Sequence, residues 1–222
     1  MFHVKHFTKQ SNILNYFIWI KTSFIENTIT KRRWNLITID SYFPNAYIQI
    51  EKYLSNALEN ILISNRAIIF LCIGTDRSCG DSLGPLIGYK LSSIKTNKFY
   101  VYGSLENPIH SLNIESTIEK IYDSFKDPFI IAIDASLGAP KNIGKIFIEK
   151  KPLYPGAALN KTLGPIGHIS IIGVVNILNN SGFIILQNTR LYTVMTLADS
   201  ISQGIKSFIN KNSTENFSQK KM

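Results

Sequence analysis

Two aspartates follow apolar runs whose composition is typical of buried strands. Asp81 ends a polar, glycine-rich loop that succeeds the run 67–73, and Asp134 directly follows the run 129–133. The carboxyl ends of parallel strands meet at one edge of an α/β sheet, so neighbouring strands would bring both carboxyl groups to one crevice. Such a pair can share a proton, bind a metal ion or position a water molecule as general base. The alternative is that Asp81 caps a helix and Asp134 caps a turn.

Three further side chains could take part in chemistry. Cys79 lies two residues before Asp81 and could act as a nucleophile, although no histidine is close to it in sequence. His168 follows a segment rich in glycine and proline, and two aspartates with one histidine would suit a divalent metal, but a structural role for a lone histidine stays open. His110 is predicted to cap a helix.

The loop 74–81 (GTDRSCGD) is glycine-rich but lacks both common phosphate-binding patterns, GxGxxG and GxxxxGK followed by Ser or Thr. A nucleotide site is therefore not favoured. The sequence predicts no cofactor and assigns no metal ligand.

The elements that would position these residues alternate between strands and helices. Helices are expected over 46–62, 82–95, 111–125 and 191–209, and strands over 66–73, 98–103, 129–134, 144–149 and 183–187. The segment 169–178 is apolar and fits either state. This alternation predicts an α/β fold, a three-layer sandwich with a twisted, mostly parallel sheet between helices.

The periodic pattern covers 45–210, which predicts a single α/β domain with a polar tail over 211–222. Residues 1–44 lack a sustained period and are interpreted as a leader, either disordered or the result of a start assigned too early. The second option arises because Met1 to His6 can be encoded by a self-complementary DNA sequence.

The net charge of +9 is concentrated towards the ends of the chain. Residues 1–45 hold six basic and two acidic residues and 211–222 hold three and one, whereas 46–210 hold fifteen and twelve. We therefore expect no nucleic-acid binding by the folded domain. The apolar run Ile13 to Ile20 is too short to span a membrane. Two cysteines seven residues apart make no disulfide framework, so a cytoplasmic protein is expected.

Five segments carry a family resemblance when they are taken together. They are 72–85 (CIGTDRSCGDSLGP), 132–138 (AIDASLG), 154–159 (YPGAAL), 173–176 (GVVN) and 186–191 (LQNTRL). In combination they resemble the YyaC-type sporulation proteins, relatives of the germination protease of bacterial endospores. The resemblance covers roughly residues 60–210 and implies a fold shared with the hydrogenase maturation endopeptidases.

The resemblance also implies roles for individual residues. By motif, the two aspartates proposed as the catalytic pair of the germination protease fall on Asp81 and Asp134. Residues of the matching segments are expected to contact substrate, namely Gly74, Thr75, Ser136 and Gly156. The maturation enzymes hold nickel with acidic residues and a histidine, for which His168 is a loose candidate. This chain has Gly80 where the protease loop has proline.

Two functions therefore remain as hypotheses from sequence. The first is a sporulation-associated, aspartate-dependent endopeptidase that acts on small spore proteins in the cytoplasm of the sporulating cell or forespore. The second is a non-catalytic sporulation protein that uses the same crevice to bind a peptide or a divalent metal. A metal-assisted peptidase that depends on His168 is a third possibility.

Overall fold

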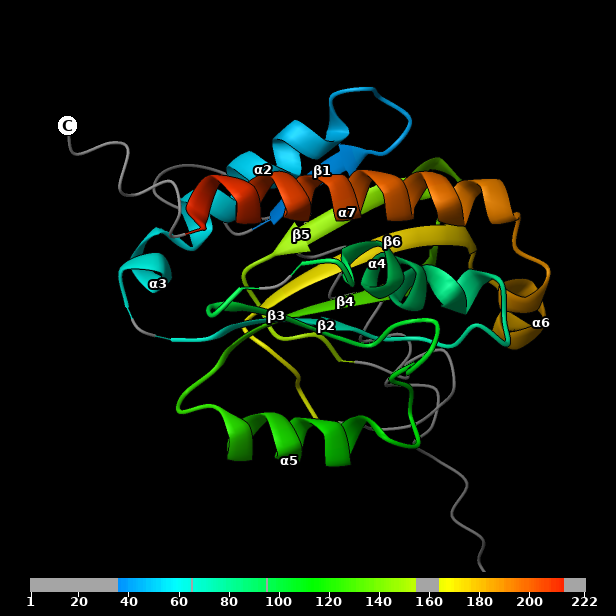
Figure 1. The fold of residues 1–222 in the computed structure, drawn as a ribbon. Helices are drawn as coiled ribbons and strands as arrows, with labels where there is room; N and C mark the ends of the chain where they lie inside the picture. Colours follow the sequence, from blue (N-terminus) through cyan, green and yellow to red (C-terminus); the bar gives the residue numbers. More distant parts are fainter. Residues whose placement is uncertain (1–35, 65, 95, 155–163, 214–222) are drawn as a thin grey trace, which may run out of the picture. The chain divides into compact units, whose positions relative to one another are not determined.

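A six-stranded sheet forms the centre of the computed structural model, which describes residues 36–64, 66–94, 96–154 and 164–213 (Figure 1). The strand order is β1-β5-β6-β4-β2-β3; the last four run parallel, and β5 is antiparallel to both β1 and β6. The strands are β1 (Leu36–Asp40), β2 (Ile68–Cys72), β3 (Phe99–Tyr102), β4 (Phe129–Gly138), β5 (Lys145–Glu149) and β6 (Ile169–Ile177). The predicted α/β class with a mostly parallel sheet is confirmed.

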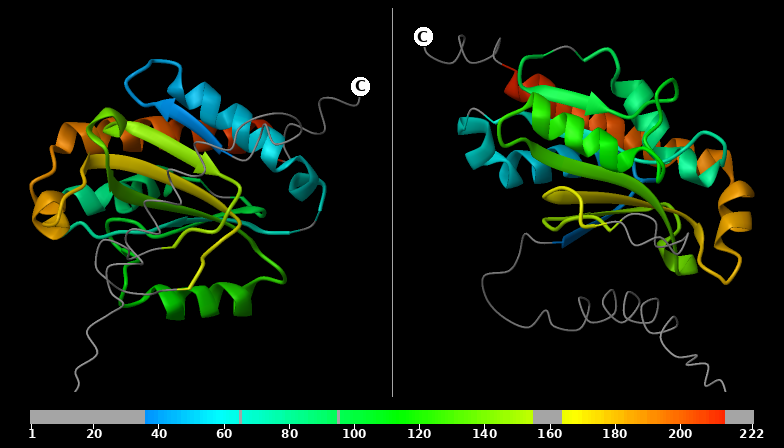
Figure 2. Two further views of the ribbon diagram at one scale, coloured as in Figure 1. Left: turned by 180° about the vertical axis from the view of Figure 1, so that it is seen from behind. Right: turned by 90° about the horizontal axis from the view of Figure 1, so that it is seen from below.

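Helices cover both faces of this sheet, which makes the three predicted layers (Figures 1 and 2). Helices α2, α4 and α7 pack on one face, and α5 packs on the other. No helix among the described residues is both long and apolar enough to cross a membrane. The helices are α2 (Ala46–Ala57), α3 (Glu59–Ile63), α4 (Leu83–Leu91), α5 (Ile114–Ser124), α6 (Gly182–Gln187) and α7 (Leu191–Asn212), with 3-10 turns η1 (Gly80–Ser82) and η2 (Pro140–Asn142).

The continuous apolar runs in the sequence reflect strands that are buried on both faces. In β2, Ile68 and Phe70 belong to the core beneath α2, α4 and α7, whereas Ile69 and Leu71 belong to the core beneath α5. All five residues of β2 are buried. Because side chains alternate between the faces of a strand, a strand in the middle of a three-layer sandwich needs apolar residues at every position.

The structure differs from the sequence prediction in two elements. Residues 183–187, predicted as a strand, lie in helix α6, because so short a run, with four apolar residues before Gln187, has no period that separates the two states. Strand β1 comes from the segment 1–44 that was interpreted as leader, and it pairs in register with β5. The ambiguous segment 169–178 contains strand β6.

Glycines let the loop after β2 and helix α4 lie directly against the strand ends. Gly74 has φ +142°, and a Cβ atom there would overlap the carbonyl oxygen of Asp81. A Cβ on Gly84 would overlap the carbonyl of Ile73, and one on Gly88 would overlap that of Gly103. Backbone therefore meets backbone at all three positions, and the position of Asp81 depends on this close approach.

Replacing Gly74 by alanine tests this packing. The substitution combines a strained backbone conformation with a steric overlap, so we expect a loss of roughly 1–3 kcal/mol in the free energy of unfolding. Gly164→Ala is the matched control, because no atom of the described residues lies within 4 Å of the position that a Cβ would take there. Its effect should stay within about 0.5 kcal/mol. Equal unfolding midpoints in urea for the two variants would contradict the packing argument.

Candidate active site

Asp134 lies in β4 at the point where the neighbouring strand β2 ends. The last residue of β2, Cys72, pairs with Ile133, and the Ile73 N–H donates to the Ile133 carbonyl at 2.8 Å. Strand β4 continues beside β6 to Gly138, beyond the predicted end of the strand. Asp134 is thus the first residue of β4 that β2 no longer flanks. By strand alternation its side chain shares the α5 face with Ala132.

Asp81 lies in the 3-10 turn η1, which packs against β4 and precedes α4. The loop before it closes on itself, since the Thr75 N–H donates to the Asp81 carbonyl at 3.0 Å. The helix N-cap is Ser82, and no side-chain capping bond is formed there. Asp81 therefore does not cap α4, and the capping alternative for this residue is wrong.

The two carboxyl groups interact. Burial raises the pKa of Asp134 well above its usual range, and the charge of Asp81 raises it further. The Ala135 N–H, which donates to Asp134 Oδ1 at 2.8 Å, opposes this rise. Both residues keep some solvent-accessible surface. Neighbouring carboxyl groups that cannot both ionise freely are the arrangement found in proton-sharing acid–base pairs.

The environment distinguishes the two aspartates. Burial also raises the pKa of Asp81, but the charge of His110 and the backbone N–H of Thr75 lower it. Asp134 has a like charge beside it, whereas Asp81 has a histidine. The pKa of Asp134 is therefore raised further than that of Asp81, which favours the proton on Asp134 when the pair holds one.

Sequence reasoning missed His110 as a member of this site. Its backbone is brought beside the end of β2 by a parallel bridge between Ile109 and Ile73, and the Gly74 N–H donates to the Ile109 carbonyl at 2.7 Å. The Leu112 N–H lies 3.3 Å from His110 Nδ1, a contact that orients the ring. The one available signal was that His110 follows a predicted parallel strand, whose loop must open at the same sheet edge.

His168 lies away from the aspartates. Its Nδ1 accepts the Ile130 N–H at 3.1 Å, and its ring stacks on Phe129 with centroids 4.5 Å apart. Ile130 precedes Asp134 by four residues of strand, or about 13 Å at 3.3 Å per residue. The suggested role of His168 as a metal ligand beside the two aspartates is therefore wrong. The lone pair of His168 Nδ1 accepts the backbone N–H of Ile130 instead.

The site residues present do not fit the metal set implied by the maturation enzymes. Among the described residues, no three His, Cys, Asp or Glu side chains converge in a group that could hold a metal ion. Cys79 also differs from an activated nucleophile, because burial raises the pKa of its thiol and so disfavours the thiolate.

The other predicted site residues are placed as follows. Gly74 and Thr75 hold the loop of Asp81 in place through the contacts described above. Ser136 lies on the same face of β4 as Asp134, two residues further on, just before a β-bulge. Gly156 lies outside the described residues. Substrate contact by these four residues stays a prediction.

The segment 186–191, one of the five that carry the family resemblance, also packs against the Asp81 loop. A Cβ atom on Gly80 would come within 2.8 Å of Thr189 Oγ1 and 2.9 Å of Leu186 Cδ2. Thr189 is fixed in turn, because its hydroxyl donates to the Ile185 carbonyl at 2.8 Å and accepts from Asn176 Nδ2 at 3.2 Å. Glycine at position 80 therefore lets the loop dock against the segment that follows α6.

Asp134→Asn tests the burial of an ionisable group at this position. A carboxyl whose pKa is raised on folding holds a proton that the unfolded chain releases above about pH 4, so stability falls as pH rises towards the folded-state pKa. Asparagine removes this dependence. We expect the melting temperature of the variant, relative to the parent, to increase between pH 4 and pH 8.

The exposed Asp123 of α5 provides the control for this measurement. Asp123→Asn should change the melting temperature by a similar small amount at each pH. A pH-independent difference for Asp134→Asn as well would show that its carboxyl is not perturbed by folding.

Comparison with known proteins agrees with the resemblance seen in the sequence. A family described as a protein of unknown function, DUF1256, matches residues 38–204. The protein YyaC of Bacillus subtilis is 43% identical over 157 residues, which cover 71% of this chain and 76% of YyaC. Among solved structures, the nickel–iron hydrogenase maturation protease HycI of Thermococcus kodakarensis aligns with a TM-score of 0.41 and 19% identity over 68% of this chain and 99% of HycI. On its match to residues 38–204, the chain belongs to the DUF1256 family, and its identity to YyaC makes it a relative of that protein.

Proposed function

We propose that this protein is an aspartate-dependent endopeptidase in which Asp81 and Asp134 activate a water molecule against a peptide bond. The observation that carries the proposal is the asymmetry of the pair: Asp134 is buried beside a like charge, whereas His110 and the Thr75 N–H favour the ionised form of Asp81. One carboxylate and one carboxylic acid at a single site are what general acid–base hydrolysis requires at moderate pH.

The two groups then have separate roles in hydrolysis. Ionised Asp81 takes a proton from water while the water oxygen bonds to the peptide carbonyl carbon. Neutral Asp134 donates a hydrogen bond to the carbonyl oxygen as negative charge develops on it. The C–N bond breaks as the proton held by Asp81 passes to the leaving amine. The products are a carboxyl group and an amine, and Asp81 returns to its ionised form.

The biological setting of the proposal rests on the family resemblance. The motifs around Asp81 and Asp134 resemble those of sporulation proteins related to the germination protease, so small spore proteins are the proposed substrates and the cytoplasm of the sporulating cell or forespore the proposed location. The non-catalytic alternative is a protein that binds the same peptides without cleaving them.

Cleavage assays with single-site variants test the proposal directly. The full-length parent would be incubated with small acid-soluble spore proteins over pH 4–9 and the products read by mass spectrometry. We expect discrete cleavage, reduced about 10²- to 10⁴-fold in Asp81→Asn and in Asp134→Asn and unchanged in the control Asp123→Asn. Cleavage that survives both substitutions would overturn the mechanism. No cleavage by the folded parent would favour the binding alternative.

The pH dependence of cleavage identifies the group beside Asp81. The cleavage rate should rise with pH as Asp81 ionises and fall again as Asp134 loses its proton. The rise, called the acid limb of the pH profile, should lie above the ordinary carboxyl pKa of about 4. Because the charge of His110 lowers the pKa of Asp81, His110→Gln should move the acid limb to higher pH. His168→Gln is the control, because His168 contacts the start of β4, and it should not change the pH at which the acid limb lies. A shift with His168→Gln and none with His110→Gln would contradict the assignment.

A further inference from the structure

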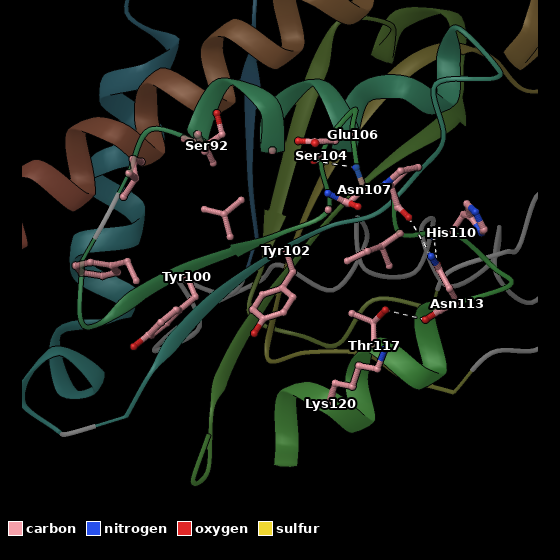
Figure 3. A pocket seen from close by; sticks show the side chains of 18 of the residues that line it. Ser92, Tyr100, Tyr102, Ser104, Glu106, Asn107, His110, Asn113, Thr117 and Lys120 are labelled. Carbon is pink, nitrogen blue, oxygen red and sulfur yellow. Dashed lines mark hydrogen bonds between the residues drawn. The ribbon is translucent and has the colours of Figure 1, made fainter. Parts of the chain in front are cut away.

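The outer edge of the sheet beyond β3 lies in a groove that leads to the candidate site. The groove has a volume of about 1050 Å³ and is bounded by α4, α5 and the loop 103–113. Figure 3 shows β3 along its length, with Tyr100 towards one end and His110 at the other. Since β3 is last in the strand order, no described strand pairs with its outer side.

The register of β3 shows which backbone groups face this groove. In a parallel pair, a residue bonds to the two neighbours of its partner rather than to the partner itself. Ile68 is the partner of Phe99, and its N–H donates to the Lys98 carbonyl at 2.8 Å, so Phe99 faces outward. By alternation Val101, the partner of Phe70, also faces outward.

The first of these two outward positions is occupied by a side chain of the protein itself. The Thr96 hydroxyl accepts the Phe99 N–H at 2.9 Å and donates to the Phe99 carbonyl at 3.1 Å, as the backbone of an added strand would. No described side chain does the same for Val101. The N–H and carbonyl of Val101 thus present an unpaired backbone donor and acceptor to the groove, and a peptide backbone is the ligand that matches them.

The edge continues into the candidate site. Beyond β3, Ile109 takes the place beside Ile73 at the end of β2 through a parallel bridge. The next residue, His110, lies within electrostatic range of Asp81. A chain that pairs with Val101 and extends along this edge at about 3.3 Å per residue would therefore run past His110 towards the carboxyl edge of the sheet, the edge at which both aspartates lie.

The two walls of the groove differ in chemistry. The wall formed by α4 and the residues after it includes Leu91 and Ile94. The α5 wall includes Thr117 and Lys120 (Figure 3). Lys120 is exposed, and none of the ion pairs among the described residues involves it. Because successive side chains of an extended peptide point to opposite sides, such a peptide would place alternate apolar and acidic residues against these walls.

We propose that the outer edge of β3 is the substrate-docking surface, where an extended peptide segment adds as a strand at Val101 with apolar side chains towards α4 and an acidic side chain towards Lys120. The inference rests on the proposed function for the identity of the ligand as a peptide. The β3 edge would bind the peptide, whereas cleavage would take place at Asp81 and Asp134.

Binding to the full-length Asp134→Asn protein tests the docking without cleavage. The probe is a fluorescein-labelled octapeptide of alternating valine and glutamate, compared with a version N-methylated at alternate residues and with a version whose order is scrambled. We expect saturable binding of the first by fluorescence anisotropy and protection of 99–102 in hydrogen exchange. The N-methylated and scrambled peptides should bind at least tenfold more weakly. No binding of the alternating peptide at millimolar concentration would overturn the proposal.

Two variants locate the binding surface. Val101→Pro removes one outward N–H at a position where an edge strand tolerates proline, and should weaken binding about three- to tenfold. Lys120→Glu should weaken binding of the glutamate peptide about tenfold and favour a valine–lysine peptide instead. Lys141→Glu, in η2, is the charge-matched control. Unchanged peptide affinity in Val101→Pro and Lys120→Glu would overturn the proposal even if the parent cleaves spore proteins. A dimer in sedimentation that Val101→Pro disrupts would also overturn it, because the β3 edge would then pair with a second copy of this chain.

Discussion

The direct contact between the backbone of Asp81 and Gly74 fixes the geometry on which the site depends. Gly74 has no side chain, so the turn that carries Asp81 folds back onto the end of β2 instead of extending into solvent. Gly84 gives helix α4 the same close approach to Ile73. The consequence is electrostatic: Asp81 is held where its charge acts on the buried carboxyl of Asp134. The glycines at these positions therefore place the Asp81 carboxyl group through close backbone contacts.

The carboxyl pair carries a cost in stability that a purely structural role does not require. Burial raises the pKa of both aspartates, and the second carboxyl raises that of Asp134 further. Buried ionisable groups without a counter-charge destabilise the folded state at neutral pH, which is why such groups cluster at functional sites. The open edge of β3 is a second feature of this kind, because an unpaired edge risks aggregation unless it has a partner. His110 lines the groove at this edge and also acts on Asp81, so the two features fit one function.

The sequence predicted the parts of this site that depend on local pattern. The runs before Asp81 and Asp134 are apolar at every position, which identified central parallel strands and therefore a common sheet edge for the two residues. His110 and His168 could not be placed in this way. The position of His110 depends on a bridge between Ile109 and Ile73, and that of His168 on a bond to Ile130, contacts between segments far apart in sequence. Residues 183–187 were misassigned because their helix buries only Leu186 and so shows no amphipathic period.

The central claim is that Asp81 and Asp134 form one coupled acid–base pair. Carbon-13 NMR titration of the aspartate side-chain carboxyl groups, in the parent and in Asp81→Asn, measures this coupling without any assumption about substrate. The account predicts that Asp134 titrates well above the ordinary aspartate value of about 3.9 and that its pKa falls when Asp81 is neutral. A pKa of Asp134 near the ordinary value, or one that does not change in Asp81→Asn, would contradict the account.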